Sequence, residues 1–253
     1  MRVLARGLCF ALLAQVGWVA SAHGQDLFVL EAYRPVIERT DRWEAELHFN
    51  YVAQGPAATA QHYHAALELS HVLNSTLSLA GYALVGRRPG LAPEVGGWRL
   101  RALVAAPERW RLPIRMGFVG ELEYTRPAFS DHRFALELVP LFNVAGRRWD
   151  IAFNPGIEWE FPAAGVGTEV EWEPSARLAY QVTAGITATL EYYAILGEVT
   201  DPLPVVQQIH QFYPGLDVRL GEDVTWNVGL GVGVTSAGNR LTLKTRFEVP
   251  FGR

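Results

Sequence analysis

Five glutamates flank one short loop, and their alternate spacing is typical of one face of a β-hairpin. They are Glu158 and Glu160 before the loop, and Glu169, Glu171 and Glu173 after it. A loop centred on residues 164–165 sets Glu160 opposite Glu169, and the same register sets Glu158 opposite Glu171. Like charges directly opposite each other destabilise a strand pair. Guanidinium groups, bound cations or protonation must therefore neutralise them.

Arginine is the cation that the chain offers these carboxylates, because it has 21 Arg and a single Lys, Lys244. Seven arginines fall on the polar faces of the predicted strands: Arg99, Arg101, Arg115, Arg133, Arg177, Arg219 and Arg246. Two interpretations stay open. A Glu–Arg network can fill the interior of a narrow barrel, or the glutamates can form a cation-attracting strip in a pore.

Two histidines, His62 and His64, share one face of a predicted strand, and His48 is expected nearby on the preceding strand. Two imidazoles at this spacing can bind one metal ion. The sequence fixes no third ligand, so we expect these histidines to line a polar rim and predict neither a metal nor a cofactor. His71, His132 and His210 are scattered and indicate no further site.

The elements that position these side chains are strands with one apolar and one polar face. From Trp43 to Tyr51 every odd-numbered residue is apolar or aromatic, and every even-numbered one is Glu, His or Asn. The same alternation of period two recurs along the chain. It predicts twelve strands: 42–54, 61–74, 76–86, 96–106, 111–125, 132–144, 148–161, 168–181, 184–196, 207–220, 223–235 and 240–251. The residues at 82, 84, 210 and 212 blur the parity of the third and tenth strands.

Strand length and aromatic placement favour a barrel in a membrane over a soluble β-sandwich. The predicted strands have about 11–14 residues, whereas about 5–6 is usual in soluble proteins. Trp149 and Trp159 share a face, and at a tilt of about 40° they stand about 25 Å apart along the membrane normal. Tight turns such as 107–109 alternate with longer loops, which is the layout of outer-membrane barrels. We therefore predict an all-β, transmembrane antiparallel β-barrel of about twelve strands.

The first residues have the pattern of an export signal. Arg2 and Arg6 precede an apolar run over 8–19, and the small residues 20–22 offer a cleavage site after Ala22. The run is shorter than the ~20 residues of a spanning helix. Removal of this segment takes away Cys9, the single cysteine, and changes the formal charge from −4 to −6. A disulfide framework is then excluded, and the negative charge argues against a nucleic-acid partner.

We divide the chain into a signal peptide over 1–22, a periplasmic lead-in over 23–41 and the barrel over 42–253. Within the lead-in, residues 27–30 fit a short strand, and a short helix in the barrel mouth is another interpretation. Pro35 argues against a helix through the whole segment.

An enzyme is the third class of function to weigh, because some twelve-stranded outer-membrane barrels are lipid hydrolases. They need a nucleophile and a base close together. Ser70 and His71 are adjacent, so on a strand their side chains point to opposite faces. The sequence therefore favours a protein that is not an enzyme.

Several stretches resemble bacterial outer-membrane barrels of a transporter-like type, including the family labelled for the meta-pathway of phenol degradation. They are 30–33 (LEAY), 43–47 (WEAEL), 190–193 (LEYY) and 229–235 (GLGVGVT). The resemblance implies a barrel but no catalytic residues. Such barrels usually end in an aromatic residue that the assembly machinery reads, whereas here Phe251 is followed by Gly252 and Arg253.

These observations predict a Gram-negative outer-membrane barrel that is a narrow passive channel for small solutes. A structural or assembly-partner barrel with a plugged lumen is the alternative, and a lipid hydrolase is the least favoured. The expected partners are outer-membrane lipid, the outer-membrane assembly machinery and small solutes. The number of barrels that associate is left open.

Overall fold

Twelve long strands dominate the fold. The structure, a computed structural model, describes residues 26–37, 42–130, 132–162, 168–221 and 223–252. The long strands are β1 (Trp43–Gln54), β2 (Tyr63–Asn74), β3 (Leu77–Arg87), β4 (Glu94–Ala105), β5 (Arg115–Thr125), β6 (His132–Ala145), β7 (Trp149–Pro162), β8 (Glu169–Gln181), β9 (Ile186–Ile195), β12 (Ile209–Leu220), β13 (Val224–Gly233) and β14 (Leu241–Phe251). The predicted signal peptide and Cys9 lie outside the described residues.

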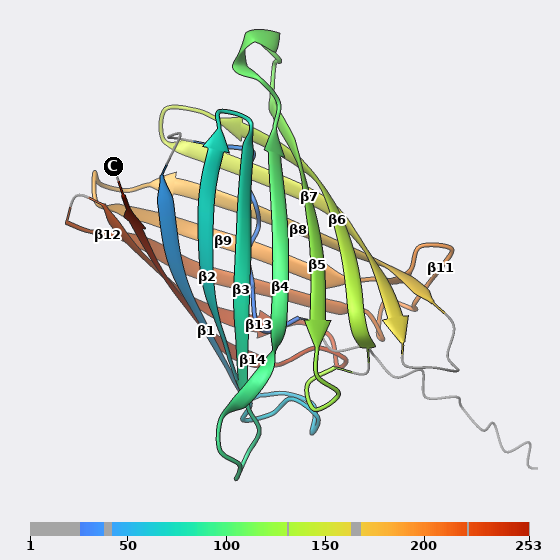
Figure 1. Cartoon of the computed structure of the whole chain (residues 1–253). Helices are drawn as coiled ribbons and strands as arrows, with labels where there is room; N and C mark the ends of the chain where they lie inside the picture. Colours follow the sequence, from blue (N-terminus) through green and yellow to red (C-terminus); the bar gives the residue numbers. More distant parts are fainter. Residues whose placement is uncertain (1–25, 38–41, 131, 163–167, 222, 253) are drawn as a thin grey trace, which may run out of the picture.

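The sheet closes on itself, which confirms the predicted barrel (Figure 1). Each long strand pairs antiparallel with its neighbours, and β1 pairs with β14, with Trp43 opposite Phe251. Closure leaves no edge among the twelve long strands, as a sheet exposed to lipid requires. The two-residue strands β10 (Gly197–Glu198) and β11 (Asp201–Pro202) form a hairpin in the connection between β9 and β12, and β10 pairs with β8.

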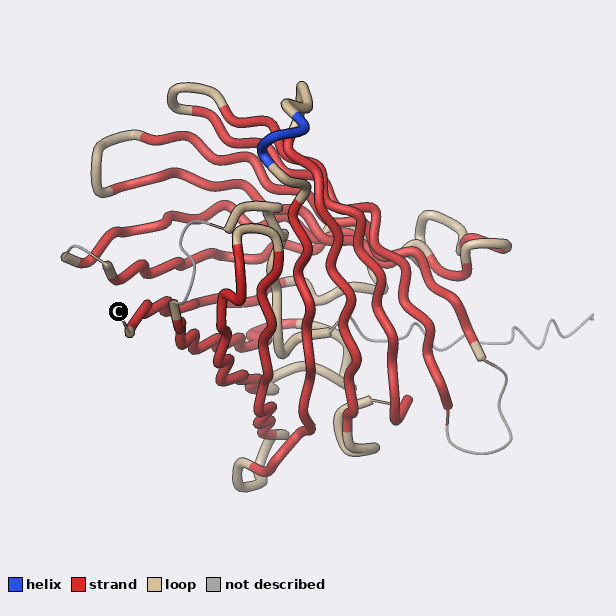
Figure 2. The backbone as a smooth tube through the Cα atoms, turned by 45° about the horizontal axis from the view of Figure 1, so that its top comes forward, coloured by secondary structure: helices blue, strands red, loops and turns tan. Residues whose placement is uncertain are grey.

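The barrel has two different ends. We call the end with the β2–β3, β4–β5, β6–β7, β8–β9 and β12–β13 connections the short-turn end, and the opposite end the long-loop end. One connection at the short-turn end differs from the expectation of a turn over 107–109. It runs over 106–114 and contains η1 (Glu108–Trp110), seen as the blue turn in Figure 2. Arg111 adopts a left-handed φ of 49° and Pro113 has no N–H to donate, so β5 begins at Arg115 rather than near residue 111.

The two faces of the wall follow the predicted alternation. Leu47, Leu67 and Leu100 point outward and are 47%, 56% and 54% exposed. Glu68, Asn154 and Gln211 point into the lumen and have no exposed surface. An apolar exterior around a polar interior is the arrangement that a barrel in lipid needs. Among the described residues, no helix has the length and apolar character to cross a membrane.

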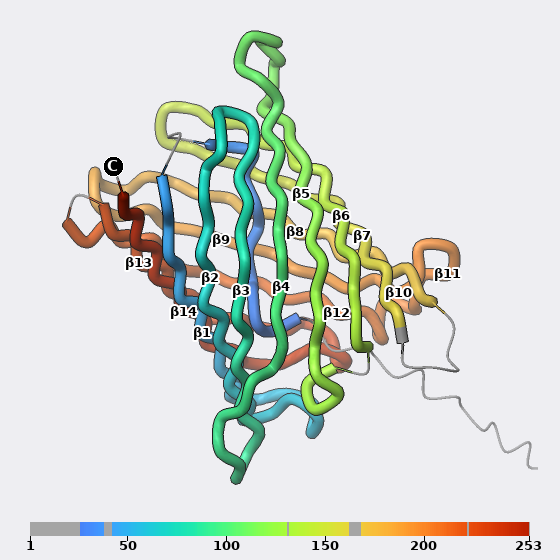
Figure 3. Tube along the Cα trace, viewed as in Figure 1, coloured from blue at the N-terminus to red at the C-terminus, as the bar shows by residue number. Residues whose placement is uncertain are grey.

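The N-terminal segment (residues 26–37) lies inside the barrel (Figure 3). The side chains of Leu27, Phe28, Val29 and Leu30 are at most 7% exposed. Phe28 packs against Phe129 near the long-loop end, and Ile37 packs against the cluster of Leu103 and Ala105 near the short-turn end. The segment therefore runs the length of the lumen. The sequence assigned these residues to a periplasmic lead-in, whereas the structure encloses them in the barrel.

Wall side chains hold this segment, which has no described helix or strand of its own. The Asn50 side chain donates to the Leu27 carbonyl at 2.8 Å, and the Asn154 side chain donates to the Tyr33 carbonyl at 3.1 Å. Side-chain amides thus replace part of the strand pairing that the segment lacks.

The apolar part of the segment also explains the two strands with blurred parity. Tyr82 and Leu84 on β3 point into the lumen and pack with Phe28 and Val29. On β12, Tyr213 points inward and packs with Leu30, whereas Phe212 lies on the outer face and is 38% exposed. The inward faces of these strands are partly apolar because they contact the apolar part of the segment.

Candidate functional site

The predicted glutamate register is present in the hairpin of β7 and β8. Glu160 lies opposite Glu169 and Glu158 opposite Glu171, while Glu173 faces Gly156. The Nδ1 atom of His132, at the start of β6, lies 2.6 Å from the Glu160 carboxylate. His132, which the sequence left without a role, therefore belongs to this group.

The row of glutamates is longer than the sequence indicated. Four of them stand directly opposite one another on neighbouring strands: Glu121 on β5, Glu137 on β6, Glu158 on β7 and Glu171 on β8. Glu198 on β10 continues the row beside Glu171. We call these five residues the glutamate row. Glu121 and Glu137 were missed because aligning them requires the registers of three consecutive strand pairs, although both lie on the polar parity of predicted strands.

Arg99 joins the N-terminal segment to β5. Its guanidinium group donates to Asp26 of the segment at 2.5 Å and to Glu121 at 2.9 Å. It also bonds Glu123 through Nε at 2.7 Å. Tyr33 of the segment donates to the other oxygen of Glu121 at 2.7 Å. One end of the glutamate row is thus part of the attachment of the segment.

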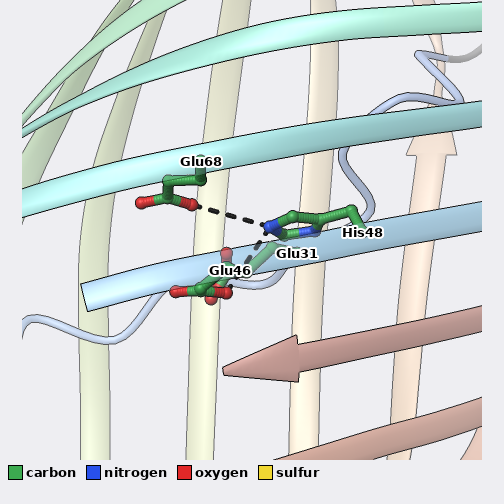
Figure 4. A group of neighbouring side chains, drawn as sticks. All are labelled: Glu31, Glu46, His48 and Glu68. Carbon is green, nitrogen blue, oxygen red and sulfur yellow. Dashed lines mark ion pairs between the residues drawn. The ribbon is translucent and has the colours of Figure 1, made fainter. Parts of the chain in front are cut away.

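Arg101 and Arg246 form a second set of ion pairs in the lumen. Arg101 bonds Glu68, and Arg246 bonds Glu31 of the N-terminal segment. Arg246 also lies 3.2 Å from Glu46. Glu31, Glu46, His48 and Glu68 consequently meet at one place (Figure 4). The sequence named only His48 of these four, as a neighbour of His62 and His64, although Glu46 also lies on the polar parity of the first strand.

A third set lies near the short-turn end. Arg177 bonds Asp217 and lies 3.7 Å from Glu191. The Lys244 ammonium group bonds Glu191 and donates to the Tyr193 hydroxyl at 3.1 Å. These side chains come from the neighbouring strands β8, β9 and β12 and from β14, so the network extends beyond one strand pair.

The predicted arginines therefore have different positions. The ion pairs described here join Arg99, Arg101, Arg177 and Arg246 to carboxylates beyond the five glutamates that the sequence singled out. Arg115, Arg133 and Arg219 are exposed, and Arg219 borders both of the lumen cavities described below. A Glu–Arg network does occupy the lumen, but the N-terminal segment supplies two of its carboxylates, Asp26 and Glu31.

Open space remains beside the N-terminal segment. Two cavities of about 390 Å³ lie in the half of the lumen nearer the short-turn end, and Glu31, Arg34 and Arg246 border both. Next to the glutamate row the space narrows to about 60 Å³, between residues that include Glu137, Glu158 and Arg99. The lumen is therefore wide at one end and constricted beside the row.

The other sequence candidates do not assemble into a site. The rings of His62 and His64 stack with centroids 5.9 Å apart, and His64 also packs against Phe28. Burial and the nearby Arg88 lower the pKa of His62. Among the described residues, the groups of three or more metal-ligating side chains do not include His62 or His64. Ser70 is buried on the lumen side, whereas His71 stacks on Trp43.

No family model and no curated protein matches the chain. Solved structures do match its fold. The NanC porin in a rhombohedral crystal form is 8% identical, with a TM-score of 0.58 over 83% of this chain and 100% of that one. The KdgM porin is 12% identical, with a TM-score of 0.55 over 83% and 99% of the two chains. A KdgM complex with disordered oligogalacturonate gives 9% identity and a TM-score of 0.54 over the same shares. The protein therefore has the fold of the twelve-stranded outer-membrane porins.

Proposed function

We propose that the protein is an outer-membrane channel for small solutes whose own N-terminal segment closes the lumen. The observation that carries the proposal is the course of residues 26–37 through the barrel, with cavities of about 390 Å³ left beside them. The porin fold and the resemblance to transporter-like barrels support a transport role. The export-signal pattern supports location in the outer membrane.

The way the segment is attached suits a closure that can open. The segment is held by side chains, namely Asn50, Asn154, Arg99 and Arg246, and has no strand pairing to the wall. Releasing it leaves the twelve-stranded hydrogen-bonding of the barrel intact, because the wall closes between β1 and β14 without it.

The glutamate row supports a preference for cations. Rings and rows of carboxylates attract cations where a pore is narrow, and the row borders the constriction of about 60 Å³. Cations in this space would also offset the repulsion between glutamates that stand opposite one another.

The test compares the wild-type protein with a variant in which residues 26–37 are replaced by a Gly–Ser sequence of the same length. In planar bilayers the variant should show steady conductance steps with cation preference, and the wild type should be closed for most of the time. Gly–Ser replacement of residues 107–113, outside the strands, is the matched control and should behave like the wild type. If the segment variant folds but shows no conductance, the lumen is permanently filled and the structural barrel is the better interpretation.

A further inference from the structure

Four side chains converge in the lumen at a place that the glutamate row does not reach. Glu31 comes from the N-terminal segment, Glu46 and His48 from β1, and Glu68 from β2 (Figure 4). Each offers one ligand atom, and the four atoms all lie within 4.8 Å of one another. The convergence depends on the segment, because Glu31 completes it.

The atoms that face one another are buried and make no hydrogen bond. They are the Oε2 atoms of Glu31, Glu46 and Glu68 and the Nε2 atom of His48. His48 is 2% exposed and Glu68 is fully enclosed. Burying polar atoms without hydrogen bonds is unfavourable, so their shared orientation calls for a common partner.

The two separations from His48 Nε2 fit ligands of one ion better than hydrogen bonds. His48 Nε2 lies 3.4 Å from Glu46 Oε2 and 3.5 Å from Glu68 Oε2, the pairs marked by dashed lines in Figure 4. A charge-assisted hydrogen bond would measure about 2.7–2.9 Å. Two ligands on a tetrahedral ion with bonds of about 2.1 Å stand about 3.4 Å apart.

The surrounding arginines hold these carboxylates by their other oxygens. Arg101 bonds Glu68 through Oε1, and Arg246 bonds Glu31 through Oε1. Both bonds leave the Oε2 atoms free to approach His48 Nε2, and Arg101 Nη1 lies 3.8 Å from Glu31 Oε2. Arg246 also lies 3.2 Å from Glu46 Oε2, and this contact would lengthen when an ion binds. Hydrogen bonds to the second oxygen of a ligating carboxylate are a usual feature of metal sites.

The charges favour a cation. Glu31, Glu46 and Glu68 carry three negative charges, whereas Arg101 and Arg246 supply two positive charges. Glu248 lies opposite Glu46 on β14, and Glu44 lies on the same face of β1, so further carboxyl groups surround the four side chains. A bound cation offsets this excess of carboxylates. The cavity of about 390 Å³ that Glu31 and Glu46 border offers a path of entry.

We propose that Glu31, Glu46, His48 and Glu68 bind a divalent transition-metal ion of the Zn²⁺, Co²⁺ or Mn²⁺ class. Imidazole suits Zn²⁺ and Co²⁺, and carboxylate oxygens suit all three ions. Because Glu31 belongs to the N-terminal segment, the bound ion ties the segment to β1 and β2. Its effect on opening rests on the proposed channel function, whereas binding itself does not.

The experiment titrates Co²⁺ into the folded protein in detergent and follows the visible absorption that Co²⁺ gains from protein ligands. The wild type should bind one equivalent. His48→Gln and Glu68→Gln should each weaken binding about tenfold or more, since losing a ligand costs at least as much as losing its outer partner. The matched control is His64→Gln, another buried lumen histidine, which should bind like the wild type. Heat-modifiable gel mobility checks that each variant is folded.

Two results would overturn the site. One is a wild-type protein that binds no Co²⁺, which would mean that contacts within the protein already satisfy the four side chains. The other is binding that His64→Gln abolishes and His48→Gln preserves. X-ray absorption of the Zn²⁺-loaded wild type decides the matter even if a variant does not fold, because the site requires one imidazole among oxygen ligands. None of these measurements depends on conductance, so they succeed or fail independently of the channel proposal.

Discussion

Gly96 on β4 offers a direct way to loosen the N-terminal segment without touching it. A Cβ atom at this position would lie 2.6 Å from Cζ of Phe28, and the nearest backbone atom, the Leu84 carbonyl oxygen, would be 3.5 Å away. The added methyl group of Gly96→Ala therefore clashes mainly with the ring of Phe28. Overpacking of this kind costs about 1–3 kcal/mol. This cost applies only while the N-terminal segment lies inside the lumen. The ratio of molecules with the segment outside the lumen to molecules with it inside then rises roughly five- to 150-fold.

Single-channel recording measures this ratio as the open probability. Gly96→Ala should open more often than the wild type, whereas Gly81→Ala should not, because a Cβ at Gly81 meets only Leu100 at 3.8 Å. In a Phe28→Ala background the effect of Gly96→Ala should shrink, since the ring it would strike is gone. An unchanged open probability in folded Gly96→Ala would refute the idea that seating of Phe28 keeps the lumen closed.

Three further predictions concern the wall and its charges. Leu178→Arg, on the exposed face, should lower the free energy of unfolding in vesicles by about 1–3 kcal/mol. Ala179→Arg, beside a lumen cavity, should lower it less. Equal losses would mean that the assigned faces are wrong. Arg99→Gln removes the partner shared by Asp26, Glu121 and Glu123 and should cost about 3–5 kcal/mol in denaturant unfolding, whereas Arg88→Gln, in a half-exposed pair with Glu94, should cost at most about 1 kcal/mol. Glu160→Gln with Glu169→Gln should shift the reversal potential of the open Gly–Ser variant towards lower cation selectivity while heat-modifiable mobility persists; an unchanged potential would place the conducting path elsewhere.

The strands of the barrel wall could be predicted because their pattern depends on residues that are close in the sequence. Alternation of period two follows from strand geometry, and the polar face of β1 and the apolar face of β14 lie where the pattern indicates. The register of Glu158 and Glu171 was also predictable, since one short loop determines it. The alignment of Glu121 and Glu137 with this pair depends on the registers of several strand pairs. Errors in predicting each register add up from strand to strand.

A Glu–Arg network in the lumen was one of the two interpretations of the sequence, but the course of the N-terminal segment through the lumen could not be predicted, because this stretch has no periodicity of its own. Residues 26–37 are positioned by side chains that are distant in the sequence, such as Asn154 and Arg246. Their carboxylates also change the partners of Arg99 and Arg101, so the ion pairs differ from the expected network. The group around His48 was likewise not predictable from the sequence, because one of its members, Glu31, belongs to the N-terminal segment inside the barrel.

The central claim is that the N-terminal segment fills the lumen, and protection of residue 32 from a thiol reagent tests it most directly. In a Cys9→Ser background, Ala32→Cys places a thiol on the N-terminal segment where the native side chain is 5% exposed, and Ser236→Cys places one on an exposed loop residue. A membrane-impermeant maleimide is added to the folded proteins and, in parallel, to heat-unfolded samples. If the segment fills the lumen, Ser236→Cys reacts fully while Ala32→Cys stays unlabelled until it is unfolded. Labelling of folded Ala32→Cys as fast as Ser236→Cys would contradict the account.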